Sequence, residues 1–521
     1  MKFFLNFFYN ISPLKLAAQR NNIEIIQLLL AECESIEPNC FDGCDKLTEI
    51  TIPSFMTKIG INSFSGCTSL TKVVIPSSVT LIEKSAFFKC LSLTNIIIPS
   101  SVTYIGSDAF NGCSSLTKVI IPSSVTKIES SAFFNCSSLE SINIPSSVIY
   151  IGNNAFYGCD SLLNFEFPSS MTYIEEALLM KCQSLTHIKI PSSVTTIESE
   201  TFRECSSLKE ISFPSSVIYI GSYALHECTS LNYVKLSSSM KSIEQSLLWG
   251  CTSLTLIAIP SSVTSIGFGA FEDCTSIAHI SIPSSVTRIE SKAFCNCSSL
   301  QLLIIPSSVT YIGSMALAKC KSMYLIQIST SITSIEPFLF SECSSLISIQ
   351  VPSSVTSIGL CAFKECDILS EVVIPSSVTT IGDNAFRECR SLTLIDIPSS
   401  VINLGNCAFY GCKSLCKILI PSSIKLIQQG LFCKCVSLKE VIIPSSVISI
   451  GESSFEECSL LTEIIIPSSV KLIGYEAFYN CSSLKKVSIL SSPVIENRAF
   501  SAISPSAKIV YNDKGSKCQI Y

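Results

Sequence analysis

The sequence predicts an α/β repeat solenoid, in which one short structural unit stacks on the next along most of the chain. A cysteine recurs every 23 residues from Cys44 to Cys481, which defines twenty consecutive units. Strict self-similarity at a period of about 20–30 residues is typical of solenoids. The hydrophobic fraction is 47% and the charged fraction 14%, so the chain can bury a continuous core.

Each unit is expected to combine one strand, two corners and a short irregular or helical back. The unit 113–135 reads CSSLTKVIIPSSVTKIESSAFFN. Variable and apolar positions alternate over 118–121, as in a half-buried strand. Pro122 ends this strand, because proline cannot donate to a hydrogen-bond ladder. Ala132 and Phe133 follow at a helical or 3₁₀-like spacing, which places them on the opposite wall.

The columns of the repeat also suggest how its corners are built. Two serines follow the proline in most units, and we interpret their hydroxyl groups as partners of backbone groups at the corner rather than as nucleophiles. Seven residues after the proline, glycine and glutamate alternate over much of the array, as at Gly60 and Glu83. Because glutamate is accepted there, this column does not require a positive φ.

The 28 cysteines raise the question of disulfides and metal sites. Neighbouring column thiols would lie about one strand spacing apart, so geometry alone does not exclude pairing. A uniform inward column is more typical of reduced, buried thiols, which behave as small hydrophobes. Cys295 and Cys297 are separated by one residue, which does not match the spacing of a zinc site. No metal ligand is expected.

No arrangement typical of an enzyme is present in the sequence. There are three histidines, and two of them, His187 and His279, fall in the same strand column four units apart, hence about 19 Å from each other. They cannot share a metal ion or a proton relay at that distance. Neither a glycine-rich phosphate loop nor a nucleophile elbow occurs. We therefore expect no catalytic residue and no cofactor.

Charge and hydropathy limit the classes of partner. The net charge is −5 and no polybasic run occurs, which argues against nucleic acid or an anionic membrane as the main partner. Polar residues interrupt every apolar run before the ~20 residues of a membrane-spanning helix, so no transmembrane segment is expected. Asn6 and Asn10 break the first apolar stretch, and Lys15 and Arg20 follow it. This pattern favours an amphipathic first helix over a cleaved signal peptide.

The unit pattern L-x-x-I-x-I-P-x-S-V-x-x-I-G-x-x-A-F-x-x-C resembles the 23-residue leucine-rich repeat of BspA-like surface proteins, over residues 36–500. The resemblance implies a right-handed superhelix with a parallel β-sheet on its concave face. It also implies roles in adhesion and in binding host or matrix proteins at cell surfaces.

The two ends of the chain depart from the repeat. Residues 1–35 include SPLKLAAQRNNIEIIQLLL, which resembles the helix–turn–helix of a single ankyrin repeat, and we expect it to cap the first turn. Residues 501–521 include ISPSAKIVY, which predicts a terminal strand followed by a polar tail. The expected organisation is therefore a helical cap, the solenoid over 36–500, and a C-terminal cap.

Binding information is expected where the repeat varies on a fixed backbone, at the two outward positions of each strand. These positions are polar over 141–235 and apolar over 74–120 and 256–325. Exposed apolar patches often mark interaction sites, but β-branched residues also simply favour strands, so both kinds of zone stay candidates. We favour the polar zone, and its expected protein-binding residues are Asn164, Glu166, His187, Lys189, Glu210, Tyr233 and Lys235.

Two functional hypotheses follow. The first is a non-enzymatic scaffold that presents its concave face to a protein partner at a cell surface, as the resemblance implies. The second is an intracellular interaction scaffold that uses the same face, which the N-terminal sequence and the expected reduced thiols favour. The sequence leaves the location open between these two.

Overall fold

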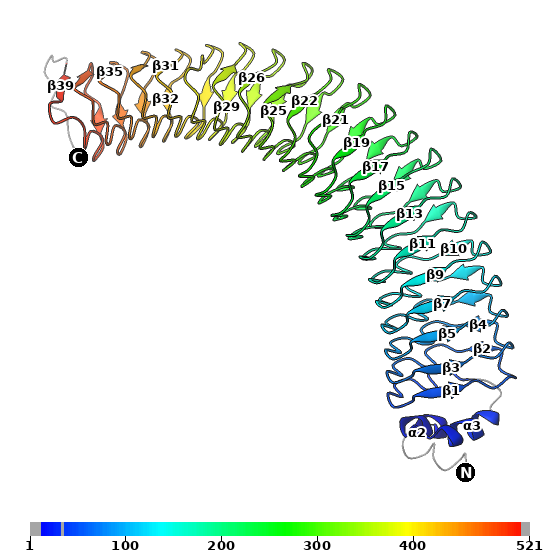
Figure 1. Cartoon of the computed structure of the whole chain (residues 1–521). Helices are drawn as coiled ribbons and strands as arrows, with labels where there is room; N and C mark the ends of the chain where they lie inside the picture. Colours follow the sequence, from blue (N-terminus) through cyan, green and yellow to red (C-terminus); the bar gives the residue numbers. More distant parts are fainter. Residues whose placement is uncertain (1–11, 33–35, 512–521) are drawn as a thin grey trace. The chain divides into compact units, whose positions relative to one another are not determined.

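The computed structural model describes residues 12–32 and 36–511 (Figure 1). These residues belong to two compact units, of which unit 1 ends at Ser262 and unit 2 begins at Val263. Each unit is a parallel β-solenoid, built by stacking turns of the 23-residue repeat. The expected repeat solenoid with parallel strands is confirmed. Two sets of strands run through each unit, and we call them the first and the second ladder.

The first ladder contains the strands of three or four residues, paired in parallel at a register of one repeat. In unit 1 it consists of β1 (Glu49–Thr51), β3 (Lys72–Val74), β5 (Asn95–Ile97), β7 (Lys118–Ile120), β9 (Ser141–Asn143), β11 (Asn164–Glu166), β13 (His187–Lys189), β15 (Glu210–Ser212), β17 (Tyr233–Lys235) and β19 (Leu256–Ala258). In unit 2 it consists of β22 (Leu302–Ile304), β24 (Leu325–Gln327), β26 (Ser348–Gln350), β28 (Glu371–Val373), β31 (Lys417–Leu419), β33 (Glu440–Ile442), β35 (Glu463–Ile466), β37 (Lys486–Ile489) and β39 (Lys508–Tyr511).

The second ladder contains two-residue strands, which the sequence did not predict, because we expected one strand per turn. In unit 1 it consists of β2 (Lys58–Ile59), β4 (Leu81–Ile82), β6 (Tyr104–Ile105), β8 (Lys127–Ile128), β10 (Tyr150–Ile151), β12 (Tyr173–Ile174), β14 (Thr196–Ile197), β16 (Tyr219–Ile220) and β18 (Ser242–Ile243). In unit 2 it consists of β20 (Ser265–Ile266), β21 (Arg288–Ile289), β23 (Tyr311–Ile312), β25 (Ser334–Ile335), β27 (Ser357–Ile358), β29 (Thr380–Ile381), β30 (Asn403–Leu404), β32 (Leu426–Ile427), β34 (Ser449–Ile450), β36 (Leu472–Ile473) and β38 (Val494–Ile495).

Two turns of unit 2 lack a first-ladder strand at the position where the 23-residue repeat predicts one. In the first of these turns, at 279–281, only an isolated bridge forms, between His279 and Leu302. In the second, residues 394–396 form no strand. The buried residues Ile280 and Ile395 keep the inward position of the pattern in both turns. The apolar position is therefore maintained where the hydrogen-bond ladder is not.

The back of each turn is a series of tight turns and not a helix, so the structure has the irregular one of the two expected forms. Ser131 and Asn135 have positive φ angles of 57° and 53°. Their N–H groups donate to Asn153 O and Tyr157 O of the next turn, at 2.9 and 2.7 Å. Between them, the Phe134 N–H donates three residues back within its own turn. The back thus alternates bonds within a turn with bonds to the next turn.

The positions with positive φ carry many residue types, including Glu200, Lys292 and Phe338. A left-handed conformation costs a residue other than glycine roughly 1–2 kcal/mol, so stacking must offset this cost in every turn. The glycine and glutamate column has no positive φ at Gly106 and Gly152, as expected. Glycine is instead suited to a close approach there, because a Cβ on Gly106 would lie 2.7 Å from the carbonyl carbon of Glu83 in the preceding turn.

Stacked aromatic rings fill the back wall of the core. The rings of Phe110 and Phe133 are nearly parallel, with centroids 5.2 Å apart, and both side chains are fully buried. Leucine replaces phenylalanine in this column at Leu179 and Leu225 and is also fully buried. The column therefore accepts apolar side chains of similar volume, as expected.

The repeated cysteines occupy an inward, buried column, as expected. The Cys136 thiol donates to Phe110 O of the preceding turn, with a sulfur–oxygen distance of 3.2 Å, and the same contact recurs along the column. Burial raises the pKa of Cys205 and Cys251 to about 12. Since the thiolate is the reactive form of cysteine, these protonated thiols are unreactive at neutral pH.

The second of the two serine columns bonds neighbouring turns at the corner, which confirms the interpretation for the hydroxyl groups of that column. Ser124 Oγ donates to Val102 O at 2.6 Å, and the second serine of most other units makes the same bond. Where serine replaces the column proline, at Ser237 and Ser329, its own hydroxyl donates to the preceding turn. In both turns this hydroxyl also accepts a backbone N–H two residues later.

In the part of the chain that the structure describes, two short helices precede the first turn. Helix α2 (Pro13–Gln19) begins after Ser12, whose Oγ accepts the Lys15 N–H at 3.2 Å. Helix α3 (Ile23–Ala31) begins after Asn22, whose side chain caps it in the same way. The helix–turn–helix is present, while the resemblance to an ankyrin repeat is not confirmed. Most of the expected amphipathic first helix lies outside the described residues.

Side chains of the helical pair bond groups of the first turn. In the stacked turns, the Thr71 N–H donates to Thr48 O. The Thr48 N–H itself donates to Asn21 Oδ1 at 3.1 Å, and Gln27 Nε2 donates to Thr51 O at 3.2 Å. The helical pair thus replaces a preceding turn, and we infer that it caps the solenoid. At the other end, the expected terminal strand is β39, which pairs with β37.

The phenylalanine column generates a stability prediction. Phe133→Ala is expected to destabilise the fold by about 3–5 kcal/mol through the cavity it leaves, and Phe133→Leu by less than about 1.5 kcal/mol. Urea denaturation followed by far-ultraviolet circular dichroism checks both variants. Equal shifts of the two midpoints would show that the column does not depend on filled volume.

Cysteine burial generates a second prediction. Cys416 is exposed, whereas the column thiols are buried. In native protein purified under reducing conditions, a thiol reagent at pH 8 should modify Cys416 quickly, and the Cys416→Ser variant should lose one equivalent of this fast phase. The column thiols should react only after denaturant is added. Rapid native modification of Cys136 or Cys205, mapped by mass spectrometry, would contradict the buried column.

Candidate functional site

The seven predicted binding residues lie on the exposed surface of four neighbouring strands of the first ladder, β11, β13, β15 and β17, which we call the strand face. They form two columns, one on each side of the buried central residue of each strand. The first column contains Asn164, His187, Glu210 and Tyr233, which follow one another in register. The second contains Glu166, Lys189, Ser212 and Lys235.

This arrangement follows from the period of two in a strand. Ile188 and Ile211 point into the core, so the residues on either side of them must point outward. Because each turn repeats the same backbone, the side chains at these outward positions can change without altering the fold. The sequence prediction that these seven residues gather on one surface agrees with the described geometry.

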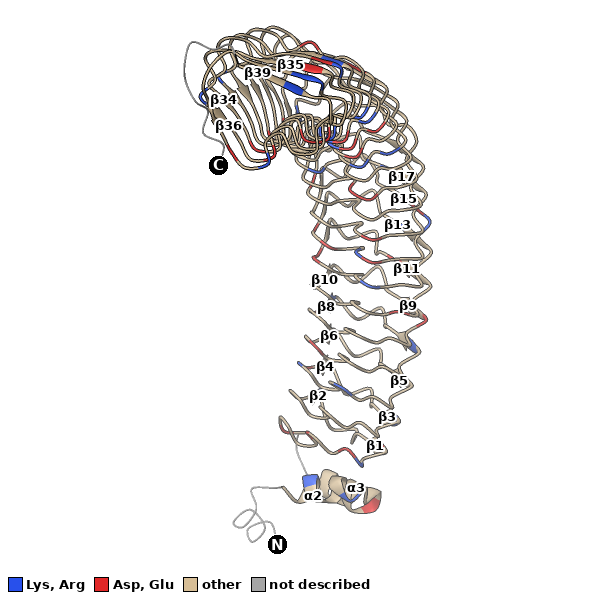
Figure 2. Cartoon of the chain, turned by 90° about the vertical axis from the view of Figure 1, so that its left-hand side faces the viewer, with Lys and Arg blue, Asp and Glu red and all other residues tan. Residues whose placement is uncertain are grey.

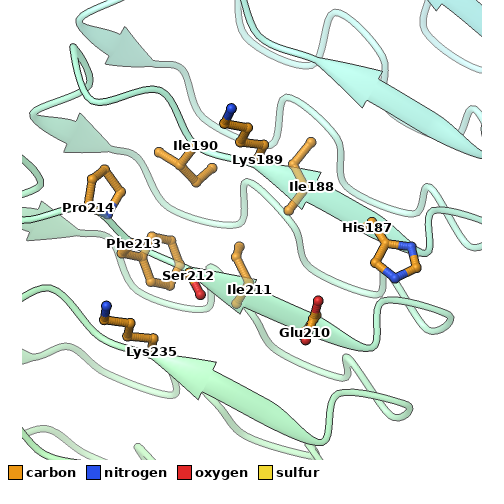
Figure 3. A pocket seen from close by; sticks show the side chains of 10 residues that line it. All are labelled: His187, Ile188, Lys189, Ile190, Glu210, Ile211, Ser212, Phe213, Pro214 and Lys235. Atoms are coloured by element: carbon orange, nitrogen blue, oxygen red, sulfur yellow. The ribbon is translucent and has the colours of Figure 1, made fainter.

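A shallow hollow of about 340 Å³ lies within this part of the strand face (Figure 3). Its polar lining comes from His187, Lys189, Glu210, Ser212 and Lys235, and its apolar lining includes Ile190, Phe213 and Pro214. Sequence reasoning did not single out Ser212, although it stands between two lysines in the same column. The sequence signal that could have identified Ser212 is its place between Lys189 and Lys235 when the outward positions of successive units are read in order.

The charged groups around the hollow are available to a partner. No ion pair within 4 Å involves Lys189, Lys235 or Glu210 among residues 12–32 and 36–511. His187 Nδ1 lies 3.0 Å from the hydroxyl group of the adjacent Thr186. Figure 2 shows that positive and negative residues are interspersed along the turns of unit 1. The hollow therefore offers charges of both signs rather than one strong field.

The apolar zones are also exposed. In unit 1, Val74, Ile97 and Ile120 follow one another in the second column, and Ile97 is 79% exposed. In unit 2, Ile304 is 54% exposed, and Leu325, at the end of the predicted apolar zone, borders a hollow of about 560 Å³ whose other lining residues lie beyond that zone. The geometry does not choose between the polar and the apolar zones.

The only tryptophan packs locally on the back of unit 1. The ring centroids of Trp249 and His226 are 4.8 Å apart, and His226 Nδ1 lies 3.2 Å from Trp249 O. His226 is buried, and this burial lowers the pKa of its imidazole. The Tyr223 ring lies edge-on to the same imidazole, with ring centroids 5.7 Å apart. This cluster therefore has a packing role.

Within the described part of the chain, no group of three or more His, Cys, Asp or Glu side chains is placed to hold a metal ion. Neither described helix is long and apolar enough to cross a bilayer.

The fold and the strand face define a solenoid of the leucine-rich-repeat class. The family model described as "BspA type Leucine rich repeat region (6 copies)" matches residues 34–162, 149–278, 264–393 and 379–507. These matches span most of the sequence, so the chain belongs to the BspA-type leucine-rich repeat family.

Comparison with solved structures finds related repeat proteins. A leucine-rich repeat protein from Bacteroides ovatus is 28% identical, over 78% of this chain and 87% of that one, with a TM-score of 0.48. A leucine rich cell surface protein from Faecalibacterium prausnitzii is 30% identical, over 56% and 76%, with a TM-score of 0.37. A leucine-rich repeat protein from Eubacterium ventriosum is 25% identical, over 60% and 82%, with a TM-score of 0.40. The comparison with curated proteins returns no match.

Proposed function

We propose that this chain is a non-enzymatic scaffold that binds a protein partner on the strand face of unit 1, through the seven predicted residues. One observation carries the proposal. Side chains that vary from turn to turn converge in register around a hollow, while the buried columns beneath them repeat. A surface of fixed backbone and variable side chains is how repeat proteins present extended binding surfaces.

The partner surface should match the mixed character of the hollow. Lys189 and Lys235 favour carboxylates, Glu210 favours a basic or hydroxyl group, and Tyr233 supplies a rigid aromatic contact. Tyr233 is 37% exposed, so its ring can still lose water on binding. Because the charges have both signs, we expect them to set specificity and orientation more than affinity.

The proposal takes two forms that differ in location. As a surface adhesin, the chain would meet host or matrix proteins, a role that rests on the resemblance to surface antigens of the family. As an intracellular scaffold, the same face would meet a partner in a reducing compartment, where the buried thiols stay reduced. Labelling of intact cells with a membrane-impermeant biotin reagent distinguishes the two, since only a surface protein would be labelled.

The strand face can be tested with a variant in which His187, Lys189, Tyr233 and Lys235 are replaced by alanine. A photo-crosslinking residue at position 164 first identifies the partner, and the affinity of the purified partner is then measured by calorimetry. The variant is expected to weaken binding by more than tenfold, because anchoring aromatic and charged residues are lost together.

A matched variant tests the apolar zone on the same face. Val74→Thr, Ile97→Thr and Ile120→Thr together keep β-branched residues in the strands while removing apolar surface. This triple variant should retain the affinity of the wild type. If the triple variant loses binding and the quadruple variant keeps it, the apolar zone is the partner site and the polar-zone proposal is wrong.

A further inference from the structure

A different surface of unit 1, formed by the second ladder, carries tyrosines and glutamates in a recurring arrangement. Tyrosine occupies the outward position of β6, β10, β12 and β16. Glutamate follows two residues after the outward position in several turns, as at Glu129, Glu175 and Glu198. Tyr173 and Tyr219 are 41% and 37% exposed, so this surface is open to a partner.

The chain itself shows what this arrangement binds. In unit 1, Lys127 pairs with Glu129 two residues later, and its Nζ lies 4.9 Å from the ring centroid of Tyr150 in the next turn. A cation within about 6 Å of an aromatic centroid is attracted by the ring quadrupole. The set therefore consists of a cation, a carboxylate in the same turn, and a tyrosine in the following turn.

The same set occurs within unit 2. Arg288 Nε lies 2.9 Å from Glu290 Oε1, and the guanidinium carbon lies 4.5 Å from the ring centroid of Tyr311. Arg288 and Tyr311 are partners in the ladder register, as Lys127 and Tyr150 are. Two complete sets built on the same backbone positions show that the geometry suits either kind of cation.

One set has a carboxylate and a tyrosine but no cation. Thr196 and Tyr219 are partners in the same register, and Glu198 follows Thr196 by two residues. Threonine is short and uncharged, so no side chain of this turn takes the place that Lys127 and Arg288 fill in theirs. Within residues 12–32 and 36–511, the side-chain partner of Glu198 is the neutral hydroxyl group of Tyr173 in the preceding turn. The set at Tyr104 is different, because its carboxylate Glu83 already binds the Lys58 ammonium at 3.3 Å.

The carboxylates around Thr196 lack a positive partner. Neither Glu175 nor Glu198 has a Lys or Arg nitrogen within 4 Å among the described residues, and Glu198 accepts a hydrogen bond from the Tyr173 hydroxyl instead. Burial and the charge of Glu198 raise the pKa of Glu175. The hydrogen bond to Glu198 raises the pKa of Tyr173 to about 12. The carboxylate of Glu198 contributes to both pKa shifts.

We propose that Thr196, Glu198 and Tyr219 form a receptor for a basic side chain, an arginine in an exposed segment of a protein partner. The guanidinium would pair with Glu198 and lie over the ring of Tyr219, as Arg288 does with Glu290 and Tyr311. This surface is separate from the strand face, so the proposal does not depend on the binding role of the seven residues there.

The test uses a fluorescein-labelled peptide of alternating arginine and glycine, and the same peptide with citrulline in place of arginine. Fluorescence anisotropy with the full chain at near-physiological salt measures both affinities. Arginine is expected to bind at least about fivefold more tightly than citrulline, since the cation–π contact and the ion pair both require charge. Thr196→Arg should abolish this preference by filling the site from within the chain.

Matched variants distinguish peptide binding at this site from the general effect of an added positive charge on peptide binding. Thr380→Arg adds the same charge to the second ladder of unit 2, where Gly382 replaces the carboxylate and Asn403 replaces the tyrosine. It should leave the preference for arginine unchanged. Tyr219→Phe should also keep the preference, and Tyr219→Leu should reduce it about threefold.

Three results would overturn the proposal. They are equal binding of the arginine and citrulline peptides, equal losses in Thr196→Arg and Thr380→Arg, and unchanged binding in Thr196→Arg. Urea midpoints identify variants with altered folding. Thr196→Arg should have a midpoint no lower than the wild type, because the added guanidinium gains partners that are already in place.

Discussion

The structure depends on the bonding of each turn to its neighbours through backbone groups that recur at intervals of 23 residues. Both ladders, the N–H groups of the left-handed residues, the thiol of the cysteine column and the serine hydroxyl all bond groups of an adjacent turn. A single turn would carry the cost of two left-handed residues and leave its apolar side chains exposed. Stacking offsets both costs, which explains the constant interval of 23 residues between the column cysteines.

The sequence was sufficient to predict the features that side-chain chemistry dictates. The period identified the solenoid, the alternation around Val119 located the first ladder, and the uniform cysteine and phenylalanine columns identified the core. Features that depend on the backbone alone left little trace in the sequence. The second ladder has only two residues per strand, and the left-handed positions accept residues such as Glu200 and Phe338, so no glycine pattern marked them.

The candidate sites show the same division. The outward residues of the strand face could be predicted because their columns vary while their neighbours repeat. The hollow, and the role of Ser212 in lining it, required the register of adjacent strands. The candidate site on the second ladder could not be predicted from the sequence. Its residues come from two turns, Tyr219 from one and Thr196 and Glu198 from the preceding one, and only the structure brings them together. Comparison with the complete sets at Lys127 and Arg288 was needed to see what is missing.

Bonding between neighbouring turns also has a mechanical consequence. Among the described residues, the turn that contains β39 is paired with one neighbouring turn, whereas an inner turn is paired with two. Under tension the chain should therefore peel from an end, one turn at a time. Each step would release 23 residues, on the order of 70 Å of extended chain, so a stretched molecule would lengthen in equal increments. The helical pair, which bonds Thr48 and Thr51, would then oppose the release of the first turn at the N-terminal end.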